Sequence, residues 1–344
     1  MMNYEVYKTI DDILGSKDKR FFSNGFKNIT HIFNDVSINP RLNKMAANCS
    51  AVYPENWSVK KNGTKLKPHL STLDIMVFAF CLDTFYINYV YQLSKEQVEN
   101  IWIRKVTIKA GNEPKLELDD IAIHTRFIST KEDSLHEGRY SSTFSNEIAG
   151  FTIVIELDHM INSLNSEEGY YHSLDEAGST IQNYCRSVVD RNKLYDISDI
   201  CIDKNNHSLS SRVNISRLGD IASFEEGCEV DNGIYSIIDI FACASQQMQA
   251  LIYTVDNIQR KNSNNLWMRK VEIEYNKPVS YLEGFTQFVH INKSKTLRMK
   301  NSTWQIADLK CSIDSPLNPI CVNVSLAHEI PETDANTELY LKVS

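Results

Sequence analysis

One histidine stands where it could exchange protons, in the stretch KPHLSTLD that precedes a long apolar segment. His69 comes five residues before Asp74, and Pro68 restricts the backbone that leads into the segment. Histidine is the side chain that most often transfers protons near neutral pH. We therefore predict that His69 is a general base. The alternative is an ordinary loop histidine.

Two aspartates, Asp74 and Asp239, each open an apolar segment with helical character. An aspartate in a first turn is commonly a cap or a partner of the helix dipole. The second segment is more polar, because it has CASQQMQ where the first has FAFCLDT. Gln246 follows Asp239 by seven residues, so both lie near one helix face. This pattern predicts Asp239 and Gln246 as catalytic partners of His69, and Asp74 and Gln247 as substrate-binding residues. Alternatively, the polar side chains satisfy one another.

Two similar strands carry an arginine among apolar residues: WIRKVTIK begins at Trp102 and WMRKVEIE begins at Trp267. Strict alternation places Arg104 and Arg269 on the apolar face of their strands. A guanidinium there must be paired or must line a polar pocket. The pattern predicts substrate binding by both arginines and both tryptophans. The alternative is a pair of structural contacts, Asp74 with Arg104 and Asp239 with Arg269.

The chain lacks several familiar signatures of cofactor and metal sites. It has no Walker loop, no GxGxxG, no GxSxG and no HExxH. Its eight cysteines are scattered without zinc spacing, which favours reduced structural thiols. We predict neither a cofactor nor a metal.

The two tryptophan strands belong to a longer duplication. The distance from Asp74 to Asp239 is 165 residues, and the distance from Trp102 to Trp267 is the same, so no gap is needed between them. Each copy has an acid, a long apolar segment, a polar loop and then the tryptophan strand. A repeat of this length indicates two copies of one domain rather than a solenoid.

Each copy must therefore build one helix and several strands. Apolar periodicity predicts helices over residues 73–93 and 235–258, each followed by strands. One long apolar helix before an antiparallel meander indicates the hot-dog architecture. The predicted fold is an α+β tandem hot-dog, in which each half is an antiparallel sheet wrapped around a central helix.

The domain boundaries follow from this pattern. The first hot-dog domain is expected over 1–159, a helical connector over 160–200 and the second hot-dog domain over 201–344. Ser173 and Glu176 have capping-box spacing within the connector. The last residues, from Ile330 onward, are expected to form a short strand or a tail.

Composition restricts the class of protein. With 42% hydrophobic and 23% charged residues, the chain is typical of a soluble globular protein. Its net charge of -8 argues against a nucleic-acid partner. The apolar run from Ile75 to Leu82 is too short to span a bilayer, and no secretion signal is evident, so we expect a cytoplasmic protein without a membrane partner. A monomer or a homodimer is expected.

The N-terminal YKTIDDILGSKDKRFFSNGFKNITHIFNDVSI, the segment AVYPENWSVK and LKPHLSTLDIMVFAF together resemble the AvrD family of bacterial avirulence-associated proteins. The resemblance covers most of the chain and is strongest in the first hundred residues. Members are implicated in making syringolides, which are acyl-sugar elicitors formed from a β-ketoacyl chain and a ketopentose such as xylulose. The A-factor synthase AfsA, also a tandem hot-dog protein, is similar in joining a β-ketoacyl thioester to a dihydroxyacetone unit.

The resemblance implies an acyltransferring or condensing enzyme. A ketose hydroxyl would attack a β-ketoacyl thioester carried by coenzyme A or by an acyl carrier protein, and an aldol-type closure could follow. The acceptor would be a sugar or a sugar phosphate. Hot-dog dehydratases pair a histidine before one helix with an acid on the partner helix, and His69 with Asp239 would match that arrangement. The HxxxGxxxxP motif is absent, which weighs against a dehydratase. The alternatives are a dehydratase or thioesterase, or a non-catalytic acyl-binding protein.

Overall fold

The computed structural model describes residues 4–55, 57, 67–111, 113–133, 136–217, 235–263, 266–275, 284–299, 302–313 and 320–330. Within these residues the strands form one antiparallel sheet in the order β1-β9-β10-β12-β13-β14-β11-β4-β7-β6-β5-β3-β2-β8. The strands are β1 Tyr4–Thr9, β2 Thr30–Asn39, β3 Lys44–Val52, β4 Trp102–Lys109, β5 Ile121–Glu132, β6 Tyr140–Ile148, β7 Phe151–His159, β8 Gly169–Ser173, β9 Lys193–Asp203, β10 Ser208–Arg217, β11 Leu266–Glu274, β12 Phe285–Met299, β13 Ser302–Ile313 and β14 Cys321–Ile330. The α-helices are α1 Ile10–Leu14, α2 Thr72–Tyr91, α3 Lys95–Glu99, α4 Ser179–Val188 and α5 Ile237–Val255.

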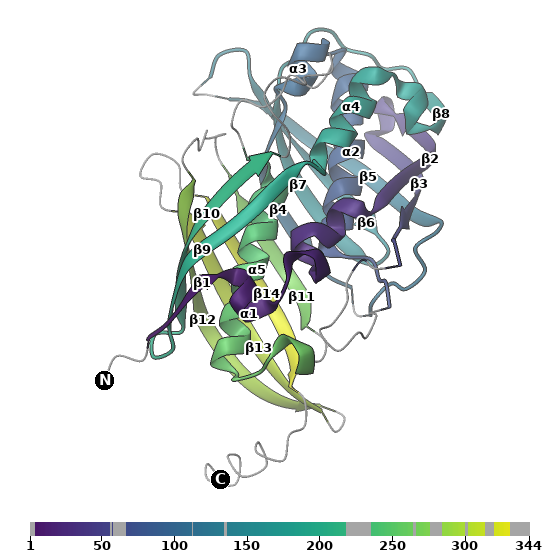
Figure 1. Cartoon of the computed structure of the whole chain (residues 1–344). Coiled ribbons are helices and arrows are strands. Elements are labelled where there is room, and N and C mark those ends of the chain that lie inside the picture. Colours follow the sequence, from purple (N-terminus) through teal and green to yellow (C-terminus); the bar gives the residue numbers. More distant parts are fainter. Residues whose placement is uncertain are drawn as a thin grey trace.

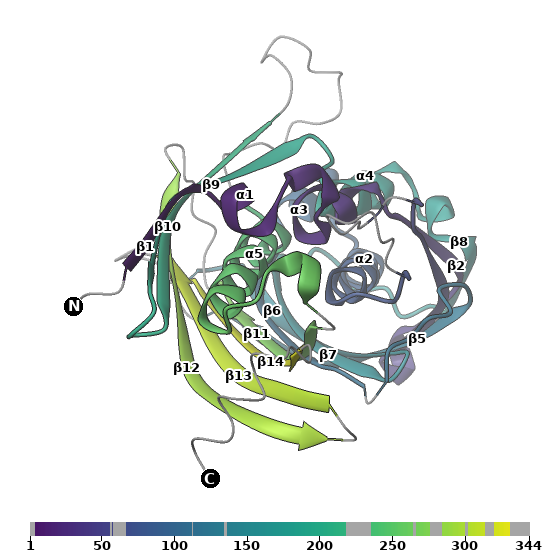
Figure 2. The same cartoon turned by 60° about the horizontal axis from the view of Figure 1, so that its bottom comes forward.

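The sheet is made of two halves that meet where β11 pairs with β4. Helix α2 packs against β2, β3, β5, β6 and β7, whereas α5 packs against β9, β10, β12 and β13. Figure 1 shows the two halves, and in Figure 2 each long helix lies within the curl of its own strands. This arrangement confirms the predicted tandem hot-dog fold.

Both long helices are capped by a serine at the N-terminus and are buried on nearly every side. Ser71 and Ser236 form capping boxes with Asp74 and Asp239, respectively. Helix α4 covers the outer side of α2, and α1 with the Phe21–Gly25 turn covers that of α5. By length and composition α2 could cross a membrane, but 89% of its most apolar window is buried within the protein. A helix enclosed by its own sheet needs no lipid, so α2 is a core helix.

The duplication is visible in the chain path. Helices α2 and α5 begin 165 residues apart, at Thr72 and Ile237, and β4 follows the first helix as β11 follows the second. The sequence pattern did not identify strands β1, β3, β6, β8, β9 and β14. Strand β6, for example, reads YSSTFSNEI, and its serines and threonine hide the alternation that its buried phenylalanine and isoleucine keep.

A β-bulge at the start of each tryptophan strand corrects the predicted position of the two arginines. In β4, Ile103 pairs with Leu157 and Lys105 with Glu156, so Arg104 is the extra residue without an opposite partner. In β11, Met268 and Lys270 flank Arg269 in the same way. An inserted residue reverses the alternation. The arginines and tryptophans therefore do not share the apolar face of the valine and isoleucine that follow.

Residues 160–200 are not the helical connector that was expected. They contain β8, a short 3-10 turn at Leu174–Ala177, the ten-residue α4 and most of β9. Ser173 does cap the turn by accepting from the Asp175 amide, but Gly178, at φ +100°, separates the turn from α4. Strand β1 pairs with β9, so the first residues join the second half of the sheet. The domain division at 159 and 201 stays a proposal.

The seven cysteines in the described part of the chain are free thiols. Cys228 and the predicted terminal strand or tail after Ile330 lie outside the described residues.

Candidate functional site

The first turn of α2 holds a buried carboxylate with several donors. Asp74 is 1% exposed. Its Oδ2 accepts from the amide and hydroxyl of Ser71, at 2.8 and 2.7 Å, and from the hydroxyl of Tyr53. Its Oδ1 lies 2.8 Å from Nε2 of His31. The carboxylate therefore joins a cap, a phenol and an imidazole in one cluster, which we call the α2 head.

His31 reaches the α2 head from β2. Its ring packs edge-on against Phe78, one turn along α2, with centroids 5.2 Å apart. The side chain is 9% exposed. Within the described part of the chain, Nδ1 of His31 has no hydrogen-bond partner. One ring nitrogen is thus fixed by Asp74 and the other is unengaged.

The α2 head keeps Asp74 ionised. Burial alone would raise the pKa of this carboxyl, but the hydrogen bonds from His31, Tyr53 and Ser71 lower it below the ordinary value. Burial and the neighbouring carboxylate raise the pKa of Tyr53, whose phenol therefore stays protonated. The cluster contains a fixed anion and a fixed donor at neutral pH.

His69 lies beside this cluster but does not bond to Asp74. Its ring stacks on Trp267 of the second half, with centroids 6.1 Å apart, and packs edge-on against Trp57 at 5.8 Å. Its carbonyl accepts a 3.0 Å hydrogen bond from the same Tyr53 hydroxyl that binds Asp74. The cluster thereby extends to the seam between the halves.

The first turn of α5 holds the matching carboxylate with a different partner. Asp239 accepts from the ammonium of Lys193 at 2.6 Å and from the hydroxyl of Tyr195 at 2.8 Å. Ser236 completes the capping box. Burial opposes ionisation of Asp239, but chiefly the charge and hydrogen bond of Lys193 lower its pKa. This α5 head is a capped ion pair in place of an imidazole pair.

A second lysine lies next to the α5 head. Lys27 is buried, with its ammonium 4.0 Å from the centre of the Tyr195 ring. Burial lowers the pKa of Lys27 to about 8, although the charge of Asp239 acts in the opposite direction. Its ammonium also donates to the carbonyl of Lys193, so it fastens residues 26–28 to β9.

The predicted catalytic trio is not joined by any contact among the described residues. His69 contacts the two tryptophans, whereas Asp239 is held by Lys193 and Tyr195. Gln246 donates to the carbonyl of Phe22 at 3.0 Å. These three assignments stay predictions.

The predicted substrate-binding residues are also spread over several places. Gln247 bonds to Gln287 in the core beside α5. Arg104 pairs with Asp133 at 3.0 Å and lies 3.8 Å from Asp158. Arg269 is exposed and donates to the carbonyl of Gly111 at 2.7 Å. The structural pairs Asp74 with Arg104 and Asp239 with Arg269 are therefore wrong, because other basic residues bind both aspartates.

Trp102 contacts an arginine of the first half and pairs with Asp158 of β7. The guanidinium of Arg139 lies 4.5 Å from its ring centre. Within the described ranges, the buried indole nitrogens of Trp102 and Trp267 find no hydrogen-bond acceptor. Among these residues the indole nitrogen is thus unpaired at both bulges. The neighbours of the two rings differ, since Trp102 contacts Arg139 and Trp267 stacks on His69.

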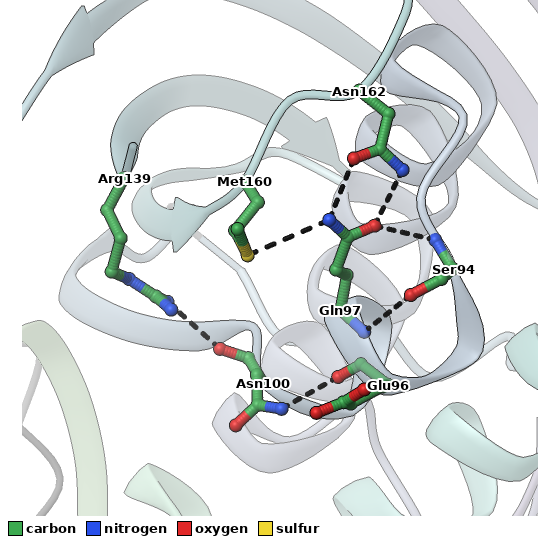
Figure 3. A pocket seen from close by; sticks show the side chains of 7 residues that line it. All are labelled: Ser94, Glu96, Gln97, Asn100, Arg139, Met160 and Asn162. Atoms are coloured by element: carbon green, nitrogen blue, oxygen red, sulfur yellow. Dashed lines mark hydrogen bonds between the residues drawn. The ribbon is translucent and has the colours of Figure 1, made fainter. Parts of the chain in front are cut away.

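An open pocket of about 520 Å³ lies between α3, Arg139 and the segment after β7. Figure 3 shows its lining: the amides of Gln97 and Asn162 bond to each other at 2.8 and 2.7 Å, and Ser94 caps α3 through Gln97. Arg139 donates to the carbonyl of Asn100. Since these polar groups already satisfy one another, the pocket is a poorer candidate than the α2 head.

Sequence reasoning missed His31, Tyr53 and Lys193. His31 precedes Asp74 by 43 residues, and Lys193 precedes Asp239 by 46. Neither spacing is a motif, because strand pairing and not helix periodicity brings these residues together. The described residues contain no group of three histidine, cysteine or acidic side chains placed to hold a metal ion.

Comparison with known families places the chain in context. The family model described as Pseudomonas avirulence D protein (AvrD) matches residues 5–331. None of the curated proteins gives a significant match.

Several solved structures share the general chain path. A tesB protein of Mycobacterium avium subspecies paratuberculosis is 7% identical, with 84% of this chain and 93% of that chain covered and a TM-score of 0.39. A conserved hypothetical protein of Mycobacterium tuberculosis, described as a double hot-dog, is 10% identical, with 96% and 97% covered and a TM-score of 0.40. The 12:0-ACP thioesterase of Umbellularia californica is 7% identical, with 87% and 94% covered and a TM-score of 0.38. Scores this low give no indication that any site is shared.

Proposed function

Because the chain belongs to the AvrD family, we propose that it is a biosynthetic enzyme that joins a β-ketoacyl thioester to a ketose such as xylulose. The family match over residues 5–331 is the observation that carries this proposal. The α2 head supports it, since an acyl transfer of this kind needs a group that takes a proton near neutral pH.

The proposed step is balanced within the two substrates. A ketose hydroxyl oxygen attacks the thioester carbonyl carbon, the carbon–sulfur bond breaks, and the hydroxyl proton passes through a base on the enzyme to the departing thiolate. The products are an acyl ketose and a free thiol. An intramolecular aldol closure of the β-keto ester can follow with loss of water and needs no oxidant or reductant.

The partners follow from the same chemistry. The donor is an acyl chain on coenzyme A or on an acyl carrier protein, and the acceptor is a sugar or a sugar phosphate. We propose no metal and no organic cofactor. The proposed location is the cytoplasm, where activated acyl thioesters are made.

The test is thiol release from a β-ketoacyl thioester, followed by mass spectrometry with and without xylulose. We expect release that depends on the sugar, together with a product that contains both the acyl group and the ketose. Equal release without sugar would contradict the proposal and indicate a thioesterase. A dehydrated thioester would indicate a dehydratase. Binding of the thioester without any reaction would indicate an acyl-binding protein.

A further inference from the structure

The two helix heads share an aspartate, a tyrosine and a capping serine, but they differ in the basic residue. Asp74 bonds to the imidazole of His31, and Asp239 bonds to the ammonium of Lys193. We propose that His31 is the general base of the proposed condensation and that Asp74 is its positioning residue. This assignment rests on the proposed function and places the chemistry at one head only.

The first argument is the protonation geometry of His31. A carboxylate oxygen accepts, so Oδ1 of Asp74 at 2.8 Å selects the form of the ring in which Nε2 carries the proton. The lone pair is then on Nδ1, which has no partner within the described residues. A base must offer a lone pair that the protein itself does not consume.

The second argument is that the two carboxylate oxygens of Asp74 have different hydrogen-bond partners. Oδ2 takes the Ser71 amide, the Ser71 hydroxyl and the Tyr53 hydroxyl, while Oδ1 is left to His31. The first turn of α2 also favours a negative charge at this position. The anion is therefore held rigidly, and it can stabilise the imidazolium that forms when Nδ1 takes a proton.

The third argument is that the α5 head cannot do the same chemistry. A protonated lysine that donates to Asp239 at 2.6 Å has no lone pair to offer. Tyr195 donates to the same carboxylate, and burial raises the pKa of that phenol well above its ordinary value. The α5 head therefore has the aspartate, the tyrosine and the capping serine, but among the described residues it has no side chain placed to accept a proton as His31 does.

His69 is less suited to the same role. Its Nδ1 lies 3.4 Å from the carbonyl of Lys67, and its ring stacks on Trp267 and packs edge-on against Trp57. Among the described residues no carboxylate bonds to this ring, so nothing would stabilise its protonated form as Asp74 does for His31. The position of His69 suits the wall of a substrate site at the seam.

The experiment compares His31→Gln, Asp74→Asn and His69→Gln by kcat/KM for ketose-dependent thiol release across pH. Because a positioned base contributes about a hundredfold to ten-thousandfold, His31→Gln should lose that much and should lose the acid limb of the pH profile. Asp74→Asn should lower kcat with a smaller change in KM. His69→Gln should lose less than His31→Gln. His172→Gln, which alters an exposed imidazole on the neighbouring β8, is the matched control and should match the wild type.

A second measurement tests the geometry without turnover. Nitrogen-15 NMR of labelled histidine should show neutral His31 with its proton on Nε2 in the wild type, and a mixture of both forms in Asp74→Asn. His31→Asn serves as the second variant if His31→Gln does not fold. A proton on Nδ1, or a folded His31 variant with wild-type rate and pH profile, would overturn the assignment. If the wild-type protein turns over no thioester, the proposed function fails, while the NMR result still decides the state of His31.

Discussion

The indole of Trp267 stacks on the imidazole of His69 with ring centroids 6.1 Å apart and planes 27° apart. One residue belongs to the first strand after α5 and the other to the loop before α2, so the contact joins the two halves of the chain. It lies next to Tyr53, whose hydroxyl bonds both to the carbonyl of His69 and to Asp74. The second half therefore supports the α2 head of the first.

Removing this support should loosen the α2 head. Truncation of a large, partly buried aromatic ring costs up to about 3 to 5 kcal/mol, and Trp267→Ala should cost somewhat less because the ring is only half-buried. We expect faster hydrogen exchange in residues 67–75 in Trp267→Ala. Trp102→Ala, which removes the matching indole, should leave exchange in those residues unchanged. Equal protection of residues 67–75 in both variants would contradict the coupling.

The two bulge arginines should differ in their effect on stability. Arg104 is bonded to Asp133 and lies near the fully buried Asp158, so Arg104→Met should reduce the free energy of unfolding by about 1 to 3 kcal/mol. Among the described residues the Arg269 side chain donates one hydrogen bond, to a backbone carbonyl, and Arg269→Met should change the free energy of unfolding by no more than about 0.5 kcal/mol. Urea denaturation measures both. A raised KM in Arg269→Met would support the predicted role of Arg269 in binding an anionic substrate.

Gln247 and Gln287 form a buried amide pair, and the remaining acceptor of Gln247 and donor of Gln287 have no partner among the residues that the structure describes. Gln247→Leu alone would leave the Gln287 amide unpaired in the core, at a cost of about 1 to 3 kcal/mol. Replacing both by leucine removes the unpaired groups, so the double variant should lose less than the sum of the two single variants. Strict additivity in a double-mutant cycle would show that the pair is not coupled.

Acid should destabilise the first half through His159. Burial lowers the pKa of this ring to about 4, although its hydrogen bond to the carbonyl of Met160 favours the charged form. The unfolded chain binds the proton more readily, so stability is lost as the pH falls from about 6.5 toward 4. His159→Gln should be less stable at pH 7, but its stability should fall less steeply over this range. Parallel pH dependences of the unfolding midpoint would contradict this account.

Much of the fold could be predicted from the sequence because burial leaves a periodic trace. The apolar segments gave both long helices, and the gapless offset from Asp74 to Asp239 indicated the tandem arrangement. The arginines were misplaced because a bulge inserts one residue without changing composition, so Arg104 and Arg269 look like inward residues in the sequence. The prediction of a helical connector over residues 160–200 was also wrong. Ser173 does cap a turn, but the prediction extended a helix from it over residues that form strands β8 and β9.

The candidate site was only partly predictable. Asp74 and Asp239 in the first turn of a helix, and His69 just before one, can be recognised from the local sequence. His31 and Lys193 cannot, because strands β2 and β9 bring them to the helix heads from more than forty residues away. The pairing of the strands decides which basic residue faces each aspartate. The sequence spacing between these residues does not reveal that pairing.

The most direct test of the central claim is the formation of an acyl ketose from a β-ketoacyl thioester and carbon-13-labelled xylulose by the wild-type protein and by folded His31→Gln at equal concentration. We predict a labelled product with the wild type, in step with thiol release, and a rate lower by about a hundredfold or more with the variant. Equal rates of labelled product would contradict His31 as the base, and thiol release without any labelled product would contradict the proposed condensation itself.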